Sequence, residues 1–557
     1  MSHRPSVLIV GSGLAGLTTA VMLAWRGVFV CLVERHAGTS RHPRARSVNF
    51  RSMELLRVAG LEPDLAAAGG QSFADFRIVI AESVTGRELQ TLLPPGGAMF
   101  DANALSPARP STAGQDRVEP ILRRHAEALG AELRYSTELV SFEQDRHGVS
   151  ARIRGLAGGR EETVRADYLV AADGHRSPVR ERLGIAVHGH GTLSSNIGIL
   201  FEGDVQGVIG HRAMALYYLQ NPTFTGAFVN TDDAGRALVS VEYDPRLDSI
   251  DRFDTNRCVG IVRAALGVPD FEARIIEVLP WEMSSRVADE FSRGRVFLAG
   301  DAAHTMPPTG GLGGQTAIQD GYDLAWKLAM VLHGDAGPAL LDTYASERKP
   351  VAEITVARQT ANYVERMRPD LGHLKRGPVQ GAESLDYMSV AMGYRYRSAA
   401  ISPDPRDDLS PVESPFTPSG RPGTRAAHIP LLHRGARISL LDLIGRDFVL
   451  ICGACADGWA RAARTLAFDA DVPVSVYRIG ADVHDIDAQA QDRLGLEPSS
   501  ALLLRPDGYI AWRSPDAREA DSEMMAEALA RALCRAPETL RRRGVARPEA
   551  SPPAVHP

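Results

Sequence analysis

Cysteine is scarce in this chain. Five cysteines are spread over 557 residues, and only Cys452 and Cys455 lie close together. An odd, scattered set of this kind is not the disulfide framework of a small secreted domain. No cluster of metal-ligand residues stands out either. We therefore expect a protein of the reducing cytoplasm that has no metal centre.

Long apolar runs and excess positive charge are also missing. No apolar run reaches the ~18 residues of a membrane span, and the best candidate, residues 21–33, is broken by Arg26 and Gly27. The net charge of −6, without a basic stripe, argues against a nucleic-acid partner. The first predicted strand begins a few residues after Met1, so we expect no signal peptide. These features predict a soluble, cytoplasmic protein.

The rest of the composition is that of an ordinary globular protein. Hydrophobic residues make up 44% of the chain and charged residues 23%, both near the usual values. At 557 residues the chain is too long for one hydrophobic core, and we expect two or three domains.

A GxGxxG motif follows the first predicted strand. Val7–Val10 is a short apolar run, GSGLAG occupies residues 11–16, and a second apolar run ends in Glu34. Between a strand and a helix, such glycines give a tight turn, room for a pyrophosphate and close helix packing, and the acidic residue accepts from a ribose diol. The motif predicts an adenine dinucleotide bound by Gly11, Gly13, Leu14, Ala15, Gly16 and Glu34.

Two arginines follow Glu34 and belong to the same predicted site. Arg35 is adjacent to it, and Arg44 lies in the sequence PRAR. A cation at either place can reach the adenosine or pyrophosphate end of a dinucleotide. A solvated surface arginine is the alternative interpretation of Arg44.

The most informative segment is VFLAGDAAHTMPPTGGLGG, residues 296–314. An apolar strand stops at Gly300-Asp301, a turn with four glycines follows, and a helical pattern starts at Gln315. Asp301 can accept from ribityl hydroxyls, and bare N–H groups at a helix start favour negative charge on a ring edge. This pattern suits a flavin.

A third segment, DYLVAADGHRSPVR, carries Asp173-Gly174 after the predicted strand Tyr168–Ala171. Ser177 and Pro178 have the pattern of a helix N-cap followed by proline at the first helical position. Asp173 is a candidate cofactor residue, and an ordinary strand-to-helix turn is the alternative.

Together the three motifs resemble the FAD-dependent aromatic hydroxylases of the p-hydroxybenzoate hydroxylase type, in the same order and at about the same spacing. The likeness covers about the first 400 residues. Further segments resemble aromatic polyketide hydroxylases of the aklavinone-11-hydroxylase type: SVNFRSMELLR, QDRVEPIL, GHGTL, GYRYRS and a C-terminal domain opened by TPSGRPG.

The resemblance implies a monooxygenase that binds FAD, takes electrons from NADPH and hydroxylates a phenolic polycyclic aromatic of the polyketide type. Oxygen would add at the flavin C4a, and an electron-rich ring would attack the hydroperoxide in a pocket that excludes water. The expected partners are this small molecule and O₂, with the protein a monomer or homodimer. No protein side chain need act as the nucleophile.

The resemblance also implies roles for single residues. Gln115 would contact the linker of the flavin, and Asp301 its ribityl or pyrophosphate region. The turn would line the flavin ring with Pro308, Gly311, Gly313 and Gly314. Gln315 departs from the asparagine often found at its place in the family, so the ring contact there is an open question. For His304 we expect a packing role rather than a general base.

The predicted fold is α/β: a Rossmann-like FAD-binding domain, an inserted antiparallel sheet and a C-terminal thioredoxin-like domain. The FAD-binding domain is discontinuous, at residues 1–75, 105–185 and 280–400. Short strand-like runs place the substrate-binding sheet at 76–104 and 186–280, and a long helical pattern spans Leu341–Met367. The rest is divided into a linker at 401–425, the thioredoxin-like domain at 426–540 and a disordered tail at 541–557.

The C-terminal domain contains the sequence Cys-Gly-Ala-Cys, which can be a redox pair. Such a pair belongs at a helix N-terminus, whereas Cys452 directly follows a predicted strand and three residues separate Cys455 from the predicted helix. The proline expected before the hairpin strand is replaced by Ser499-Ser500. We therefore expect a structural or assembly role for this domain.

Substrate contacts are the least specific part of the prediction. Tyr217 and Tyr218 are adjacent on a predicted strand, so one of them should face the cavity. Arg395 and Arg397 of GYRYRS are candidates for the polar end of a flat ligand, and ordinary core or surface roles remain open for all four.

Other flavoprotein classes fit less well. A halogenase typically has a Trp-x-Trp signature, and none of the five tryptophans is paired. A disulfide reductase needs a second GxGxxG and a cysteine pair beside the flavin. A Baeyer–Villiger oxygenase on the same fold and a non-enzymatic flavin-binding sensor remain as alternatives.

Overall fold

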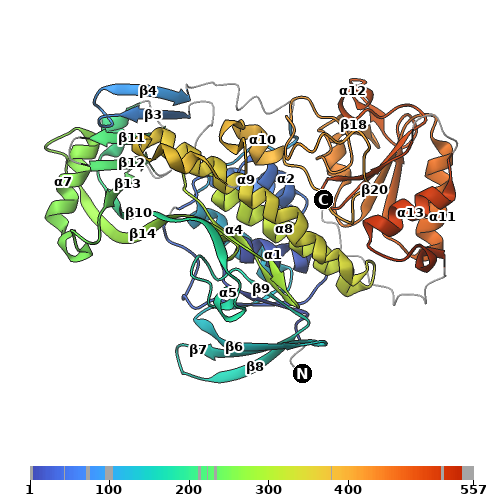
Figure 1. Ribbon diagram of the computed structural model, residues 1–557, viewed down its shortest axis with the longest axis horizontal. Coiled ribbons are helices and arrows are strands. Elements are labelled where there is room, and N and C mark those ends of the chain that lie inside the picture. Colours follow the sequence, from blue (N-terminus) through green and yellow to red (C-terminus); the bar gives the residue numbers. More distant parts are fainter. Residues whose placement is uncertain are drawn as a thin grey trace. The chain divides into compact units, whose positions relative to one another are not determined.

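The structure is a computed structural model that describes residues 4–42, 44–69, 76–93, 105–210, 215–221, 224–230, 235–377, 379–515 and 520–541. The chain divides into two compact units. The first contains residues 1–332, 341–396 and 408–418, and the second contains 333–340, 397–407 and 419–557 (Figure 1). The predicted tail lies outside the described residues except at Arg541, and so do residues 70–75 and 94–104 of the predicted domains.

A six-stranded sheet in the first unit carries the predicted dinucleotide motifs and has the strand order β15-β16-β9-β1-β2-β5. Its centre is β1 (Val7–Val10), which runs parallel to β2 (Val30–Val33) and β9 (Tyr168–Ala171). The strand β16 (Val296–Leu298) runs parallel to β9. The GxGxxG, DG and GD motifs follow β1, β9 and β16, so parallel pairing brings all three to one sheet edge, where ligands of such sheets bind.

An eight-stranded sheet forms the other part of this unit, in the order β17-β14-β10-β13-β12-β11-β3-β4. Its two longest strands, β10 (Val187–Glu202) and β14 (Arg274–Ala288), run side by side and antiparallel (Figure 1). The sheet is not purely antiparallel as predicted, because β11 (Ala215–Asn221) pairs in parallel with β3 (Arg77–Ala81). The reason is topological. The strand β3 belongs to a segment that enters the sheet before the chain returns to the six-stranded sheet, so it is not connected to β11 by a hairpin.

Two apolar layers cover the faces of this sheet. On one face, α7 (Thr255–Leu266) packs against a core that includes Ile199 and Phe228. On the other face, the C-terminal part of α9 (Asp342–Arg366) packs against Tyr218 and Met283. Alternation along each strand sends successive side chains into different layers.

The first unit contains further helices and strands, three of which form a separate three-stranded sheet. Its other helices are α1 (Leu14–Trp25), α2 (Phe50–Arg57), α3 (Glu62–Ala68), α4 (Gln115–Ala128), α5 (Pro178–Arg182), α6 (Val205–Ile209), α8 (Gly313–His333) and α10 (Tyr387–Met392). Its other strands are β4 (Glu88–Leu93), β5 (Glu132–Arg134), β6 (Thr137–Asp145), β7 (Gly148–Gly155), β8 (Glu161–Ala166), β12 (Phe224–Asn230), β13 (Arg236–Tyr243), β15 (Ser292–Arg293) and β17 (His304–Thr305). One of the strand-like runs expected in this sheet covers residues 214–219, and its first residue lies outside the described residues.

The second unit is a mixed four-stranded sheet in the order β21-β20-β23-β24, with helices beside it. This arrangement agrees with the predicted thioredoxin-like order of elements. The strands are β18 (Pro430–His433), β19 (Ala436–Ser439), β20 (Phe448–Cys452), β21 (Val474–Arg478), β22 (His484–Asp485), β23 (Ala501–Leu504) and β24 (Ile510–Arg513), and the helices are α11 (Asp457–Ala470), α12 (Ala490–Leu494) and α13 (Ser522–Ala532). Among the helices of the described ranges, none has both the length and the apolar character needed to cross a bilayer.

Candidate functional site

The GxGxxG turn has the shape that a pyrophosphate requires. Gly11 has φ +104°, and a Cβ there would lie 2.2 Å from the carbonyl oxygen of Ala172. A Cβ on Gly16 would lie 2.0 Å from the carbonyl oxygen of Gly11. Gly13, the N-cap of α1, has no neighbour within 4 Å of such a Cβ and no side-chain cap. The first N–H groups of α1 therefore stay available to an anion beside an open space.

Leu14 and Ala15 can take part in this site only through their backbone. Both side chains are buried in the first turn of α1. Their N–H groups are among the first of the helix, which have no intrahelical partner. The predicted contact to the dinucleotide therefore concerns the N–H groups of these two residues.

Glu34 directly follows β2 and is a buried, hydrogen-bonded carboxylate. Its Oε2 accepts from the N–H of Ser12 at 2.8 Å, and its Oε1 accepts from the N–H of His36 at 2.8 Å. Burial would raise the pKa of Glu34, but these backbone hydrogen bonds and the His36 side chain outweigh it and lower the pKa. An ionised acceptor at this strand end suits a ribose diol.

The predicted phosphate-binding arginines lie on the surface. Arg35 and Arg44 are both exposed. The charge of Arg44 acts on the ionisation of Glu119 and of His42, so Arg44 belongs to the neighbourhood of α4. Its position is compatible with a phosphate contact.

The Gln115 side chain lies along the first turn of α4. Its Nε2 donates to Glu119 Oε1 at 2.6 Å, and Glu119 Oε2 accepts from the N–H of Ser40 at 2.7 Å. Glu119 is 2% exposed, and burial raises its pKa. Glu119 is not among the residues predicted from the sequence, although its place four residues after Gln115 is a signal for a side-chain contact on one helix face.

Asp173 caps the short helix α5 together with Ser177. Its Oδ1 accepts from the Ser177 hydroxyl at 2.6 Å, and its Oδ2 accepts from the N–H of Val179 at 3.1 Å. The predicted N-cap at Ser177 is confirmed, since its side chain accepts from the N–H of Arg180. Both carboxylate oxygens of Asp173 thus hold the DG turn itself.

The GD motif presents Asp301 at the end of β16. Gly300 has φ +59°, and a Cβ there would lie 3.0 Å from the Cβ of Ala15 in α1. Asp301 is exposed, and within the described ranges its carboxylate has no hydrogen-bond partner. By contrast, His304 is buried, with its Nε2 2.7 Å from Asp320 Oδ2. This geometry fits a hydroxyl acceptor at Asp301 and packing at His304.

The glycine turn leads into α8 and lies beside the start of α1. Pro308 and Gly311, which has φ +68°, are exposed. Gly313 and Gly314 open α8, and a Cβ on Gly314 would lie 3.0 Å from Leu14 Cδ1 and 3.0 Å from Ala45 Cβ. The first turns of α1 and α8 therefore meet, so their partial positive charges act on one region.

Gln315 uses its side-chain amide within the protein. Its Oε1 accepts from the N–H of Asn49 at 3.0 Å, and its Nε2 donates to the carbonyl oxygen of Ser47 at 2.6 Å. The longer side chain thus reaches the backbone before α2 and fixes that segment beside the helix start. Glutamine at this position, instead of the asparagine often found in the family, therefore holds the segment before α2 in place.

The two adjacent tyrosines of β11 point into different layers. Tyr217 is fully buried in the apolar layer between the sheet and α7, where it packs on Phe228. This position does not support the predicted substrate contact of Tyr217. Tyr218 lies in the α9 layer, where its hydroxyl donates to the carbonyl oxygen of Thr309 at 3.1 Å. Arg366 donates to that carbonyl oxygen and lies 3.3 Å from the Tyr218 hydroxyl.

The arginines of GYRYRS are held by nearby carboxylates. Arg395 is 5% exposed, pairs with Asp408 at 2.6 Å and also donates to the carbonyl oxygen of Ser410. Arg397, in the second unit, pairs with Asp407 at 2.8 Å. These pairs leave the predicted substrate role of Arg395 without structural support, because its guanidinium is already committed to a salt bridge.

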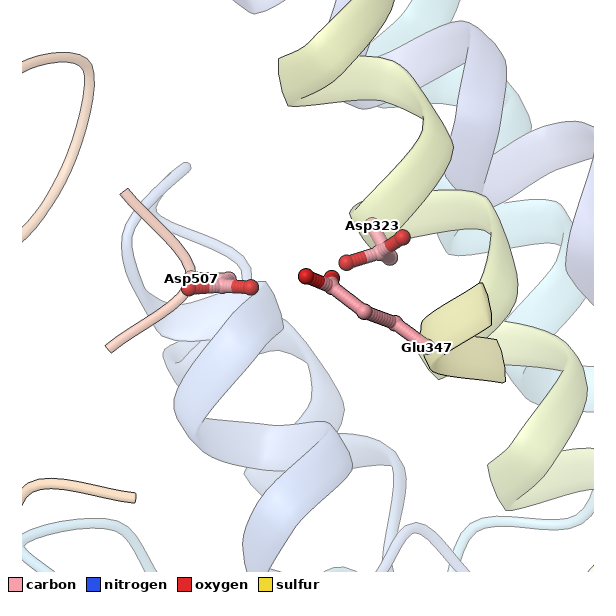
Figure 2. Close-up of side chains that lie close together, drawn as sticks. All are labelled: Asp323, Glu347 and Asp507. Carbon is pink, nitrogen blue, oxygen red and sulfur yellow. The ribbon is translucent and has the colours of Figure 1, made fainter. Parts of the chain in front are cut away.

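A buried carboxylate pair connects α8 and α9. Figure 2 shows the side chains of Asp323 and Glu347 pointing toward one another. Lys327 Nζ lies 2.7 Å from a carboxylate oxygen of each, so an ammonium group occupies the place a metal cation would take. Asp507, also labelled there, belongs to the second unit and pairs with Arg505.

The cysteine pair of the second unit lacks the features of a redox centre. Cys452 is the buried last residue of β20, and burial raises its pKa to about 12. Cys455 is exposed, and because α11 begins at Asp457, one residue separates it from the helix instead of the three predicted. A protonated, inaccessible thiol away from the helix start is a poor nucleophile.

Comparisons with known proteins identify the family. Residues 4–359 match the family model of the FAD binding domain, and residues 419–536 match that of the aromatic-ring hydroxylase C-terminal domain. The chain is 42% identical to the aklavinone 12-hydroxylase RdmE of Streptomyces purpurascens, over 96% of this chain and 99% of that protein. It is 41% identical to a 4-methyl-5-nitrocatechol 5-monooxygenase of a Burkholderia species, over 95% and 97% of the two chains.

A solved structure agrees with this assignment. The ternary complex of aklavinone-11 hydroxylase with FAD and aklavinone superposes with a TM-score of 0.89 at 41% identity, over 96% of this chain and 100% of that chain. The predicted fold class and the predicted resemblance are confirmed, and the sensor alternative is excluded. The chain belongs to the family of FAD-dependent aromatic-ring hydroxylases and is a flavoprotein monooxygenase.

Proposed function

We propose that this monooxygenase hydroxylates a phenolic polycyclic aromatic of the polyketide type, with NADPH as the reductant and O₂ as the oxidant, through a flavin C4a-hydroperoxide. The names of the aklavinone hydroxylases support the substrate class. FAD supplies the oxygen chemistry when bound. The protein has to bind and orient the substrate, stabilise its phenolate form and exclude water.

Tyr218 beside Arg366 is the observation that carries this proposal. Both contact the carbonyl oxygen of Thr309, in the turn predicted to line the flavin ring. Around them lies an apolar layer that includes Ile80, Met283 and Val364. A polar pair within an apolar layer beside the cofactor turn suits a flat phenolic ligand with one hydroxyl to be recognised.

The charges of this pair suit a phenol that must become electron-rich. Burial raises the pKa of Tyr218 by more than the charge and hydrogen bond of Arg366 lower it, so the pKa of Tyr218 lies above its ordinary value. The Tyr218 hydroxyl therefore stays protonated and keeps its hydrogen bond to the carbonyl oxygen of Thr309, and the Arg366 guanidinium is the group that would stabilise a substrate phenolate. A phenolate ring attacks an electrophilic oxygen more readily than a neutral phenol.

A substituted monocyclic catechol is a second candidate, favoured by the 41% identity to the nitrocatechol monooxygenase. NADPH oxidation should be measured with a panel of tri- and tetracyclic phenols and a panel of catechols. We expect the polycyclic compounds to stimulate it well above the substrate-free rate. Stimulation by catechols alone would overturn the polycyclic proposal, and a ring-expanded lactone product would favour the Baeyer–Villiger alternative.

Arg366→Gln tests the pair itself. We expect a loss of about tenfold or more in substrate-stimulated turnover, because a charge-assisted contact is removed, with unchanged affinity for FAD. Lys375→Gln, at the exposed ion pair with Glu365, is the matched control. Unchanged stimulated turnover in Arg366→Gln would refute the role of the pair.

A further inference from the structure

Asp320 of α8 holds the GD turn at both ends. Its Oδ2 accepts from the N–H of Gly300 at 3.1 Å and lies 2.7 Å from His304 Nε2. A carboxylate oxygen can only accept, so the imidazole donates. Asp301 lies between these two contacts in the chain. One carboxylate therefore fixes the segment on either side of the exposed residue predicted to bind the cofactor.

Arg348 of α9 keeps this carboxylate charged. Its Nε donates to Asp320 Oδ1 at 2.7 Å, and both side chains are 0% exposed. Burial would raise the pKa of Asp320, but Arg348 and His304 outweigh it and lower the pKa. An ionised Asp320 accepts strongly from both ends of the turn.

The tyrosines of GYRYRS complete the surroundings of Arg348. Its Nη1 donates to the Tyr396 hydroxyl at 3.1 Å, and its guanidinium lies 5.3 Å from the centre of the Tyr394 ring. The two rings lie 5.5 Å apart. A buried guanidinium needs partners for its donors, and these tyrosines supply a hydroxyl acceptor and a ring face.

We propose that Tyr396 is a positioning residue for FAD, acting through Arg348 and Asp320 on the turn that presents Asp301. GYRYRS was expected to contact the substrate through its arginines. In the structure its tyrosines instead contact Arg348, and Arg395 pairs with Asp408. The inference requires only the FAD-binding family, so it holds whichever aromatic compound is the substrate.

Tyr396→Phe tests the proposal with little risk to folding, because only one hydroxyl is removed. FAD is titrated into apo-protein and followed by quenching of flavin fluorescence. We expect about three- to tenfold weaker FAD binding, which corresponds to the loss of one ordinary hydrogen bond, with an unchanged KM for the aromatic substrate. Arg395→Gln, one residue away, is the matched control and should bind FAD as the unmodified protein does.

Each other outcome overturns the proposal. Unchanged FAD affinity with a raised substrate KM would restore a substrate role for the segment. A lower melting temperature of the apo-protein with unchanged FAD affinity would mean a structural role only. A second pair of variants tests the proposal without changing Tyr396. His304→Phe should weaken FAD binding, and His304→Gln should retain it because the amide can donate to Asp320. Equal FAD affinity in both His304 variants would also contradict the proposal.

Discussion

Gly314, in the first turn of α8, packs directly against Leu14, the first residue of α1, and a Cβ on Gly314 would lie 3.0 Å from Leu14 Cδ1. Two helix starts from segments 300 residues apart thus meet at one edge of the parallel sheet. Both direct unpaired N–H groups and partial positive charge toward the same region. A dinucleotide flavin has negative charge on its pyrophosphate and, when reduced, on its ring, so we propose that the two helix starts bind both ends of the cofactor.

Gly13→Ala should separate cofactor binding from folding. Nothing lies within 4 Å of a Cβ at this position, so the apo-protein should melt at an unchanged temperature. The added methyl group would occupy the space left for the pyrophosphate, and we expect FAD binding to weaken by about tenfold or more. Gly158→Ala, which also meets nothing within 4 Å, is the control. FAD binding as tight as in the unmodified protein would argue against this turn as the pyrophosphate site.

Glu34→Arg should also weaken FAD binding, because a cation there cannot accept from the ribose hydroxyls. Glu161→Gln, on an exposed stretch of β8, is the control for a general effect of charge. Equilibrium dialysis of FAD against each apo-protein measures the change. Full FAD occupancy with unchanged affinity in Glu34→Arg would contradict the assignment of Glu34 to a Rossmann-type dinucleotide site.

The pH dependence of FAD binding should reflect the Glu34 carboxylate. Its pKa is lowered from 4.5 in the folded protein. A lowered pKa means that the contribution of the ionised group is fully present above the ordinary value and is lost only as the pH falls through the lowered pKa. FAD affinity should therefore show no Glu34-dependent change between pH 8 and about pH 5. A Glu34-dependent loss of affinity near neutral pH would contradict this reading.

The double variant Cys452→Ser, Cys455→Ser should keep NADPH-coupled turnover. Because the pKa of Cys452 is raised to about 12 and its side chain is buried, iodoacetamide at pH 8 should label Cys455 but not Cys452 in the folded protein. Peptide mass spectrometry identifies the labelled thiol. Loss of turnover in a folded double variant would instead mean that the second unit carries redox chemistry.

The strands before the three motifs could be predicted from the sequence, and the motifs lie at one edge because parallel strands end at the same edge. The helix α9 was predicted as Leu341–Met367 and spans Asp342–Arg366. Periodicity could not decide which of Tyr217 and Tyr218 faces the α9 layer, since alternation fixes only that they differ. The contacts of Asp320 with His304 and Arg348 were also out of reach, because they join distant segments through buried charges that leave no local pattern.

The fate of the oxygen atom tests the account most directly. A phenolic tri- or tetracyclic compound that stimulates NADPH oxidation should be incubated with the FAD-loaded protein under ¹⁸O₂, and in parallel under ¹⁶O₂ in H₂¹⁸O. We predict that mass spectrometry of the hydroxylated product shows one ¹⁸O atom in the first experiment and none in the second. Label arriving from water, or NADPH oxidation without any oxygenated product, would contradict the proposed hydroxylation.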